Sequence, residues 1–247
     1  MDIKEGVSLV LSGGGARGFF HLGVLQALDE LKIPVKEISG ASIGAIVGAF
    51  YLAGNSPIEI FDFFKSGRYK KSFKLNLFGG SLFKVDVENK IFDEMLGDVK
   101  NLEDLPKPLY VSVTNIQQGS VSYLNKGDIK KLVLASGALY PLIGKVVVEG
   151  EYLIDGGVMD NFPISPLKGT KYPLIGSNLH PNIYQPKQSV FVRAFFLASL
   201  ARGLEDKIKL CDYYLAPKEL VGRSIFSLKN ADKLFKLGYD EAKKALS

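Results

Sequence analysis

The first 54 residues alternate between apolar runs and glycine-rich turns, a pattern typical of parallel α/β structure. An apolar run at 7–11 ends at a serine and three glycines, and from Ala16 onward apolar residues recur at helical spacing. A second run at 35–39 is broken by Gly40, after which residues 43–52 form an apolar helical stretch. Two strands, each followed by a helix, predict a βαβα unit with parallel strands and a right-handed crossover.

The same alternation continues to the end of the chain. Further strands are predicted at 109–115, 120–124, 172–177 and 212–215, and further helices near 87–97, 128–137, 187–204 and 230–246. No repeat of fixed period and no low-complexity linker interrupts the pattern. We therefore predict an α/β fold, with a mostly parallel central sheet flanked by helices on both faces, built as a single domain over residues 1–247.

Composition agrees with a globular chain and limits its chemistry. Hydrophobic residues make up 47% and charged residues 23% of the 247 positions, proportions that suit one α/β domain. The single cysteine, Cys211, excludes an intrachain disulfide framework, a thiolate zinc cluster and a CxxC redox pair, so we expect a cytoplasmic location. The most apolar stretch, 43–53, falls well short of the roughly 20 residues that span a bilayer. We predict neither a transmembrane segment nor a signal peptide.

The first glycine-rich turn is Gly13-Gly14-Gly15-Ala16-Arg17-Gly18, at the end of a predicted strand, where open parallel sheets bind ligands. Its glycines match the GxGxxG pattern of dinucleotide sites. Such a site also needs an acid at the end of the second strand to hold the ribose, but that strand ends at Ser39-Gly40-Ala41-Ser42, and Glu37 stands too early. The alternative use of this turn is a cradle of backbone N–H groups for an oxyanion.

The second turn, Gly40-Ala41-Ser42-Ile43-Gly44, has the GxSxG pattern between a strand and a helix. In that context the serine sits on a sharp turn with an exposed hydroxyl, and the flanking glycines avoid clashes with the adjacent backbone. Ser42 is therefore the candidate nucleophile. The pattern leaves one alternative open, a glycine-rich helix start with Ser42 as its N-cap.

A serine hydroxyl needs a base to take its proton, and the chain contains two candidate arrangements for this base. Ser42, Asp155 and His180 follow the chain order of the α/β-hydrolase triad, but those folds place several strands before the nucleophile, and here only one crossover unit precedes it. Asp155-Gly156-Gly157 is favoured instead, because it follows an apolar run and its glycines permit a tight turn. Asp155 acts as a base only if it is partly buried within reach of the serine. An ordinary turn residue is the alternative.

Other polar residues near these turns have structural roles in our prediction. His21 falls on the first helix and is expected to be buried or to cap it, and His180 is expected in a loop. Asp160 is expected to be structural. For Arg17 two roles are open: it steadies the glycine-rich loop, or it attracts an anionic head group.

Charge is interspersed along the chain except in one segment. The 31 Lys and Arg exceed the 26 Asp and Glu by a net charge of +5, and so modest an excess mainly aids solubility, so no nucleic acid partner is predicted. Between Asp62 and Asp86, however, basic and aromatic residues are interleaved and no acid occurs. The segment 63–84 either touches a lipid surface with its lysines and phenylalanines or packs its phenylalanines into the core.

Three motifs in order, the cradle at 13–18, GxSxG at 40–44 and the DGG turn at 155–157, resemble the patatin-like phospholipase family. The similarity also covers 20–25, 135–141 and 155–163, and it thins after about residue 180. It implies a three-layer α/β/α fold and a serine lipid acyl hydrolase, a phospholipase A, lysophospholipase or esterase, without metal or other cofactor. The resemblance further implies that Ser42 is the nucleophile of a Ser–Asp dyad, that Asp155 is its base and that residues 13–18 form the oxyanion hole. One departure, Leu142-Ile143-Gly144-Lys145 where relatives often carry Phe-Pro, concerns the pocket rather than the chemistry.

Two functions of other classes remain as alternatives. A nucleotide-binding module would use the glycines of the first turn but leave Ser42 and Asp155 without a role, and a regulatory adaptor would retain the fold without turnover. The favoured prediction gives the chain a lipid or other acyl-ester substrate. It also places the protein in the cytoplasm, with transient peripheral contact at a membrane surface as an option for the segment 63–84.

Overall fold

The computed structural model describes residues 2–76, 80–181, 190, 200–201 and 203–247. Its strands are β1 (Val7–Leu11), β2 (Val35–Ala41), β3 (Phe73–Leu75), β4 (Phe83–Val85), β5 (Leu109–Asn115), β6 (Ser120–Leu124), β7 (Val146–Val148), β8 (Glu151–Asp155), β9 (Leu174–Ser177) and β10 (Tyr213–Leu215). Its helices are α1 (Phe19–Glu30), α2 (Ile43–Leu52), α3 (Pro57–Lys65), α4 (Asp93–Leu96), α5 (Ile129–Ser136), α7 (Leu204–Ile208) and α8 (Ala231–Leu246). None of these described helices combines the length and the apolarity needed to cross a bilayer.

Eight of these strands form one sheet in the order β10-β9-β1-β2-β5-β8-β7, with β6 also paired to β5. The pairs among β10, β9, β1, β2 and β5 are parallel, whereas every pair that involves β6, β7 or β8 is antiparallel. The predicted parallel pairing of the first two strands and the mostly parallel central sheet are both confirmed. Because β1 lies between β2 and β9, the carboxyl ends of these three strands meet at one edge, where open α/β sheets bind their ligands.

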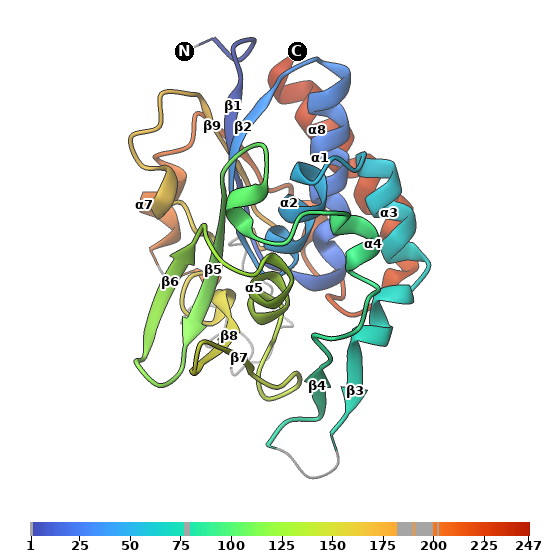
Figure 1. Cartoon of the computed structure of the whole chain (residues 1–247). Coiled ribbons are helices and arrows are strands. Elements are labelled where there is room, and N and C mark those ends of the chain that lie inside the picture. The colour runs from blue at the N-terminus through green and yellow to red at the C-terminus, as the bar shows by residue number, and fades with distance from the viewer. Residues whose placement is uncertain (1, 77–79, 182–189, 191–199, 202) are drawn as a thin grey trace.

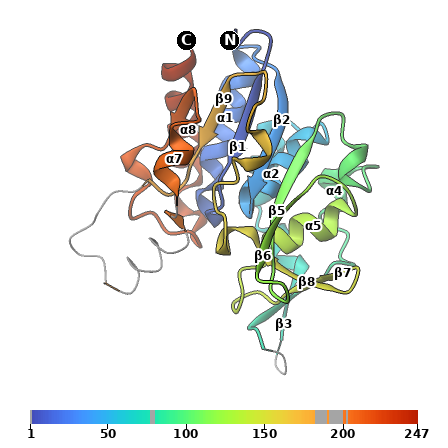
Figure 2. The same cartoon turned by 90° about the vertical axis from the view of Figure 1, so that its left-hand side faces the viewer.

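The two faces of the sheet are covered unequally. α1, α2, α3, α5 and α8 lie on one side and enclose the larger core, in which Phe20, Phe50 and Phe92 are fully buried (Figure 1). The other side carries α7 and the chain before β9, around a smaller apolar cluster (Figure 2). That cluster consists of Val10, Phe162, Ile164, Leu167, Leu174 and Leu204. The three-layer α/β/α arrangement is therefore present, with one thick and one thin outer layer.

The last helix is held against the first by two glycines. A Cβ atom on Gly23 of α1 would lie 1.9 Å from the carbonyl oxygen of Phe235, and one on Gly238 of α8 would lie 2.0 Å from that of Phe20. Glycine is required where two backbones approach this closely. The contact fixes α8 and, with it, the preceding loop 221–228, which reaches the edge of the sheet described above.

Some predicted elements differ from the observed ones. The predicted helix near 87–97 is reduced to α4, because Asn89 accepts a hydrogen bond from the Ile91 amide and donates one to the Lys71 carbonyl, which favours a turn. The segment 63–84, for which we predicted no strand, includes β3 and most of β4, which pair as an antiparallel hairpin. The predicted helix at 187–204 lies, but for a few residues, outside the described part of the chain.

Candidate active site

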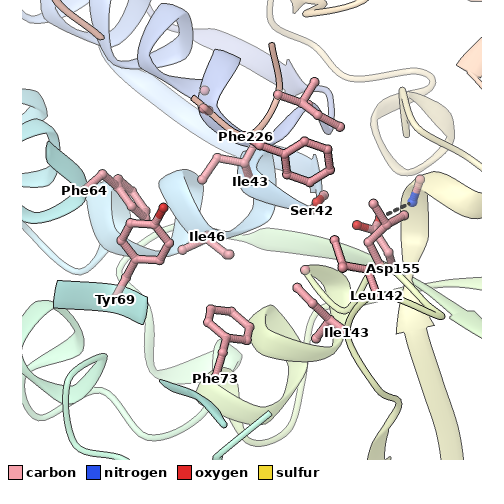
Figure 3. A pocket seen from close by; sticks show the side chains of 18 of the residues that line it. Ser42, Ile43, Ile46, Phe64, Tyr69, Phe73, Leu142, Ile143, Asp155 and Phe226 are labelled. Carbon is pink, nitrogen blue, oxygen red and sulfur yellow. Dashed lines mark hydrogen bonds between the residues drawn. The ribbon is translucent and has the colours of Figure 1, made fainter. Parts of the chain in front are cut away.

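Strand register around β5 brings Ser42 and Asp155 together. Ala41, the last residue of β2, pairs with Ser112 of β5, and the next residue of β5, Val113, pairs with Asp155 of the antiparallel β8. The two backbones are thus separated by two strand spacings, about 10 Å. Their side chains face each other across β5 at the wall of a pocket (Figure 3).

Ser42 lies on the sharp turn between β2 and α2. Its backbone has φ 53° and ψ −125°, a conformation that costs on the order of 1–3 kcal/mol for a non-glycine residue. A Cβ on Gly40 would lie 2.6 Å from the Ala45 nitrogen, and one on Gly44 would lie 2.2 Å from the Leu11 carbonyl oxygen. The GxSxG pattern therefore has the geometry of a nucleophile elbow. Although Ser42 occupies the N-cap position of α2, its side chain makes no capping hydrogen bond.

Ser136, to which the sequence assigned no role, holds this turn. Its buried hydroxyl accepts a hydrogen bond from the Ser42 amide at 2.8 Å and donates one to the Ser112 carbonyl at 2.7 Å. Since Ser136 is the last residue of α5, one hydroxyl connects the elbow, β5 and α5. The sequence signal was the stretch 135–141, which resembles the family but does not by itself show what its serine contacts.

Asp155 ends β8 and is only 5% exposed. Its Oδ1 accepts a hydrogen bond from the Gly157 amide at 2.7 Å. Burial raises the pKa of Asp155 to about 6, while hydrogen bonds from the Ser42 side chain and the Gly157 amide act in the opposite direction. Near neutral pH the carboxylate is therefore ionised and is a stronger base than an exposed aspartate. Gly156 lets the turn pass β5, because a Cβ there would lie 2.2 Å from the Ser112 carbonyl oxygen.

The glycine-rich loop faces the same pocket and offers two backbone donors. Within the described residues, the amides of Gly14 and Gly15 have no hydrogen-bond acceptor. Three other amides of the loop, those of Gly13, Ala16 and Arg17, donate to the carbonyls of Asn161, Ile225 and Gly14. Gly18 packs against the elbow, since a Cβ there would lie 2.4 Å from the Ile43 side chain. Of the predicted cradle at 13–18, Gly14 and Gly15 are thus the residues whose N–H groups remain available to an oxyanion.

Arg17 steadies this loop, one of the two roles that the sequence left open. Its guanidinium donates hydrogen bonds to the carbonyls of Arg223 and Leu179, each at 2.9 Å. Arg17 is not among the described residues that line the pocket. Burial lowers the pKa of its side chain, but a guanidinium stays charged at physiological pH. These contacts tie the loop to two distant segments of the chain rather than to a ligand.

Both histidines are buried and neutral near pH 7. His21 contacts the Ser177 hydroxyl through Nδ1 at 2.8 Å and the Ser12 carbonyl through Nε2 at 2.9 Å, and burial lowers its pKa to about 4. Its expected structural role is confirmed. Nδ1 of His180 lies 3.3 Å from Arg17 Nη1, and burial together with the Arg17 charge lowers the pKa of His180 to about 3.

The hydrogen bond that an α/β-hydrolase triad requires between its acid and its histidine is missing. Within the described residues, the side chain of Asp155 is hydrogen-bonded by Ser42 and Gly157 and not by His180. Asp160, expected to be structural, pairs with Lys207 at 2.5 Å and accepts a hydrogen bond from the Tyr123 hydroxyl at 2.6 Å. The described part of the chain has no group of three His, Cys, Asp or Glu side chains arranged to hold a metal ion.

The pocket has a volume of about 490 Å³ and is lined mainly by apolar side chains (Figure 3). Ser42 and Asp155 belong to its wall, and the apolar part of the lining includes Ile43, Ile46, Phe64, Tyr69, Phe73, Leu142, Ile143 and Phe226. Packing, one of the two alternatives for the segment 63–84, is therefore confirmed for its first aromatic residues, since Phe63 is buried in the core and Phe64 in the pocket wall. The stretch that departs from the family pattern, at 142–143, also lies in this wall.

A serine on a strained strand-to-helix turn, facing a buried aspartate beside free backbone amides, has the features of a serine hydrolase site. Comparison with known proteins places these features in a family. The model of the patatin-like phospholipase family matches residues 9–168, which include the glycine-rich loop, the elbow and the DGG turn. The chain belongs to the patatin-like phospholipase family, whose members are ester-hydrolysing enzymes.

Similar proteins include much longer ones. The chain is 34% identical over 180 residues to lysophospholipase nte1 of Aspergillus fumigatus and 35% identical over 175 residues to lysophospholipase NTE1 of Cryptococcus neoformans. Each match covers 66% of this chain but only 11% and 10% of the relative, so the chain spans about a tenth of the length of these proteins.

Among solved structures, VipD from Legionella pneumophila matches with a TM-score of 0.56 and 19% identity, over 98% of this chain and 67% of that one. ExoU of Pseudomonas aeruginosa, in complex with SpcU, matches with a TM-score of 0.50 and 14% identity, over 97% of this chain and 52% of that one. At these identities the likeness concerns the fold alone.

Proposed function

We propose that this chain is a serine lipid acyl hydrolase in which Ser42 is the nucleophile and Asp155 its base. One observation carries the proposal: Ser42, in a strained conformation, faces the buried carboxylate of Asp155 in the wall of an apolar pocket. The lysophospholipase names of the relatives favour a lipid ester as substrate. We further propose that residues 1–247 act as one domain, because β9, β10 and α8 lie beyond the family match yet complete the same fold.

In the first half of the reaction, Ser42 Oγ attacks the carbonyl carbon of the ester while the Asp155 carboxylate takes the hydroxyl proton. The carbonyl oxygen becomes an oxyanion, which the free amides of Gly14 and Gly15 stabilise by hydrogen bonds. When the tetrahedral intermediate collapses, the bond to the alcohol breaks. The leaving alcohol takes the proton from Asp155, and an acyl group remains on Ser42.

In the second half, a water molecule takes the place of the alcohol. Asp155 accepts a proton from the water as its oxygen attacks the acyl carbon, and the same amides hold the second oxyanion. Collapse releases the carboxylic acid and returns the proton to Ser42 Oγ. A single base serves both halves, because it is ionised at the start of each one.

The lining of the pocket supports an acyl chain as the part of the substrate that is bound. Apolar side chains from α2, from the segment 64–92 and from 139–143 surround the space next to Ser42. An alkyl chain placed there is removed from water, at a gain of roughly 25 cal/mol for each Å² of apolar surface buried. No described lysine or arginine except Lys70 lines this space, so the polar part of the substrate is expected at the mouth.

Transient contact with a membrane surface is a further part of the proposal. The hairpin β3–β4 projects beyond the sheet in both views (Figure 1) (Figure 2). Leu75 and Leu82 on this hairpin are 58% and 53% exposed, and Phe226 at the pocket is 69% exposed. The exposed lysines of the segment 63–84 are Lys65, which pairs with Asp232, and Lys70, Lys71, Lys74 and Lys84. Apolar side chains that enter the head-group region and lysines that attract anionic lipid suit a cytoplasmic protein acting peripherally on membranes.

A fluorophosphonate probe tests the chemistry directly, because it forms a covalent bond only with an activated serine. We expect the wild-type protein to be labelled and to hydrolyse a lysophospholipid and a short soluble ester, and Ser42→Ala to do neither. Mass spectrometry of the labelled protein should place the adduct on Ser42. Labelling at another residue, or a wild-type protein that turns over no ester, would contradict the proposal.

A further inference from the structure

Three buried side chains converge on the carbonyl group of Gly13, immediately before the proposed oxyanion donors. The Ser12 hydroxyl donates to this oxygen at 3.1 Å, and Asn161 Nδ2 donates to it at 3.4 Å. The His180 ring also hydrogen-bonds the Gly13 backbone, and this bond favours the protonated ring, as a carbonyl acceptor does. A carbonyl oxygen has two lone pairs, so three donors leave it no free capacity.

The orientation of this carbonyl decides where the Gly14 N–H group points. Both groups belong to one planar trans peptide and point in opposite directions. Holding the carbonyl toward Ser12, Asn161 and His180 therefore turns the N–H of Gly14 away from them. Gly14 lines the pocket together with Ser42, and no backbone acceptor among the described residues takes its N–H. Since glycine restricts backbone rotation least of all residues, hydrogen bonds must supply the orientation that side chains cannot.

The contacts of His180 fix its tautomer. Arg17 Nη1 can only donate, so Nδ1 of His180, 3.3 Å away, accepts, and the ring proton is on Nε2. A Cβ on Gly14 would lie 3.2 Å from Nε2, which places this nitrogen beside the Gly13–Gly14 peptide. Because burial and the charge of Arg17 keep the ring neutral, the arrangement persists over the whole working pH range.

Asn161 holds Gly13 from two sides. Its backbone carbonyl accepts the Gly13 amide at 3.2 Å, while its side chain donates to the Gly13 carbonyl. The same side chain touches the DGG turn, since a Cβ on Gly157 would lie 2.5 Å from Asn161 Oδ1. Asn161 therefore connects the oxyanion loop with the turn that carries the base.

We propose that Ser12, Asn161 and His180 are positioning residues that form a clamp on the Gly13 carbonyl and so aim the Gly14 N–H at the oxyanion. The clamp rests on the proposed function, to which it adds a role for His180 other than that of a base. It acts when negative charge develops on the substrate oxygen. Its loss therefore lowers kcat and leaves KM nearly unchanged.

The test compares His180→Leu with His180→Gln on a short soluble ester. Leucine fills the space without a donor, and we expect kcat to fall about 10–100-fold while KM changes less than about twofold, as for a weakened oxyanion hole. Glutamine carries an N–H donor near the position of Nε2, so His180→Gln should keep most of the activity. The pH at which kcat is half-maximal should be the same in all three proteins, because His180 does not titrate near neutral pH.

A double-mutant cycle with Asn161→Ala gives a second readout. Both side chains act on one carbonyl, so the loss in His180→Leu/Asn161→Ala should be smaller than the product of the two single losses. Thermal unfolding identifies any variant that fails to fold, and if His180→Leu is one, Asn161→Ala carries the same comparison of kcat with KM.

Three results would overturn the clamp. They are a wild-type kcat in His180→Leu, a loss confined to KM, and equal inactivity of the leucine and glutamine variants. The last of these would support a catalytic triad. A wild-type protein without esterase activity is a different outcome, because it contradicts the proposed function itself.

Discussion

The wall of the pocket that carries Ser42 and Asp155 and the mouth of the pocket are built in opposite ways. The wall consists of strand ends and tight turns, and hydrogen bonds hold the two reacting residues in place. The half-buried Ser42 is held through its amide by Ser136, and the buried Asp155 accepts a hydrogen bond from the Gly157 amide. Among the described residues, the mouth comprises the hairpin β3–β4 and the loop 221–228, where leucine and phenylalanine side chains are exposed. The chemistry needs atoms held to within about 0.5 Å, whereas contact with a fluid lipid surface needs only suitable side chains in one region.

Ser42→Ala is expected to abolish the reaction at the wall of the pocket and to leave the properties of the mouth unchanged. Ester hydrolysis should fall by about 10⁴-fold or more, as in other serine hydrolases that have lost their nucleophile, because no other described serine lies on such a turn. Turnover of a soluble ester and probe labelling measure this loss, and sedimentation with anionic vesicles should show unchanged binding. Retention of more than about a tenth of the activity would remove Ser42 from the mechanism.

Asp155→Asn should lower kcat by about 10³-fold or more, since the amide is nearly isosteric but cannot accept the proton. His21→Gln, a substitution at a buried histidine outside the site, is the control and should keep most of the activity. If Asp155→Asn retained wild-type kcat, the base would have to be sought elsewhere.

The same Asp155→Asn variant is expected to be more stable than the wild type at pH 8. The pKa of Asp155 is raised to about 6 in the folded protein, so ionisation is less favourable there than in the unfolded chain. The wild type therefore loses stability as the pH rises from about 4 through 6, by about 3 kcal/mol in total. Urea unfolding at pH 4 and pH 8 should show the advantage of the Asp155→Asn variant only at the higher pH. A variant that is less stable at pH 8 would indicate that the ionised carboxylate stabilises the fold.

The wild-type enzyme should lose activity in acid. Protonation of Asp155 removes the base, so kcat/KM, which reports the pKa of the free protein, should fall about tenfold for each pH unit below a midpoint near 6. A profile of kcat/KM from about pH 4.5 to about pH 8.5 on a soluble ester measures this midpoint. A midpoint near 4, typical of an exposed carboxylate, would show that burial does not tune the base.

Ser136→Ala tests whether the hydrogen bond to the Ser42 amide matters for reactivity or only for stability. It leaves the Ser42 amide and the Ser112 carbonyl without their partner, and the strained turn should relax, with a loss of about tenfold in the rate of probe labelling and about 1–3 kcal/mol in stability. The matched control is Ser39→Ala, another buried serine, whose hydroxyl donates to the Pro163 carbonyl. We expect Ser39→Ala to lose stability without slower labelling. Equal labelling rates in both variants would make Ser136 a packing residue only.

Neutralising Lys71, Lys74 and Lys84 with glutamine alters only the mouth, because Lys70, which also lines the pocket, is left unchanged. Binding to anionic vesicles should weaken by about 10–30-fold, since each lysine contributes about 1 kcal/mol near a charged surface and Lys74 is already paired with Asp86. Turnover of a short soluble ester and thermal stability should stay unchanged. Unchanged vesicle binding, or equal losses on vesicles and on the soluble ester, would rule out the contact with the membrane.

The wall and the mouth also differ in how far the sequence reveals them. The elbow and the DGG turn could be predicted because the glycines that permit each turn are adjacent to the residue that it presents. Ser136 and Asn161 could not be assigned roles, since their contacts depend on β8 pairing antiparallel with β5 and on the course of the chain after the DGG turn. The hairpin β3–β4 was missed because interleaved Phe and Lys describe a packed connection equally well.

Through the loop 221–228, the glycine-rich loop near the start of the chain depends on residues that are synthesised late. During translation the elbow leaves the ribosome early, but the carbonyls of Arg223 and Ile225, which hold Arg17 and Ala16, are made roughly 10–40 s later at about 5–20 residues per second. The loop that carries them precedes α8, which packs on α1 through Gly23 and Gly238. We therefore expect a nascent chain to contain Ser42 before the loop 13–18 is held in place, and we expect the proposed esterase activity to require synthesis through α8.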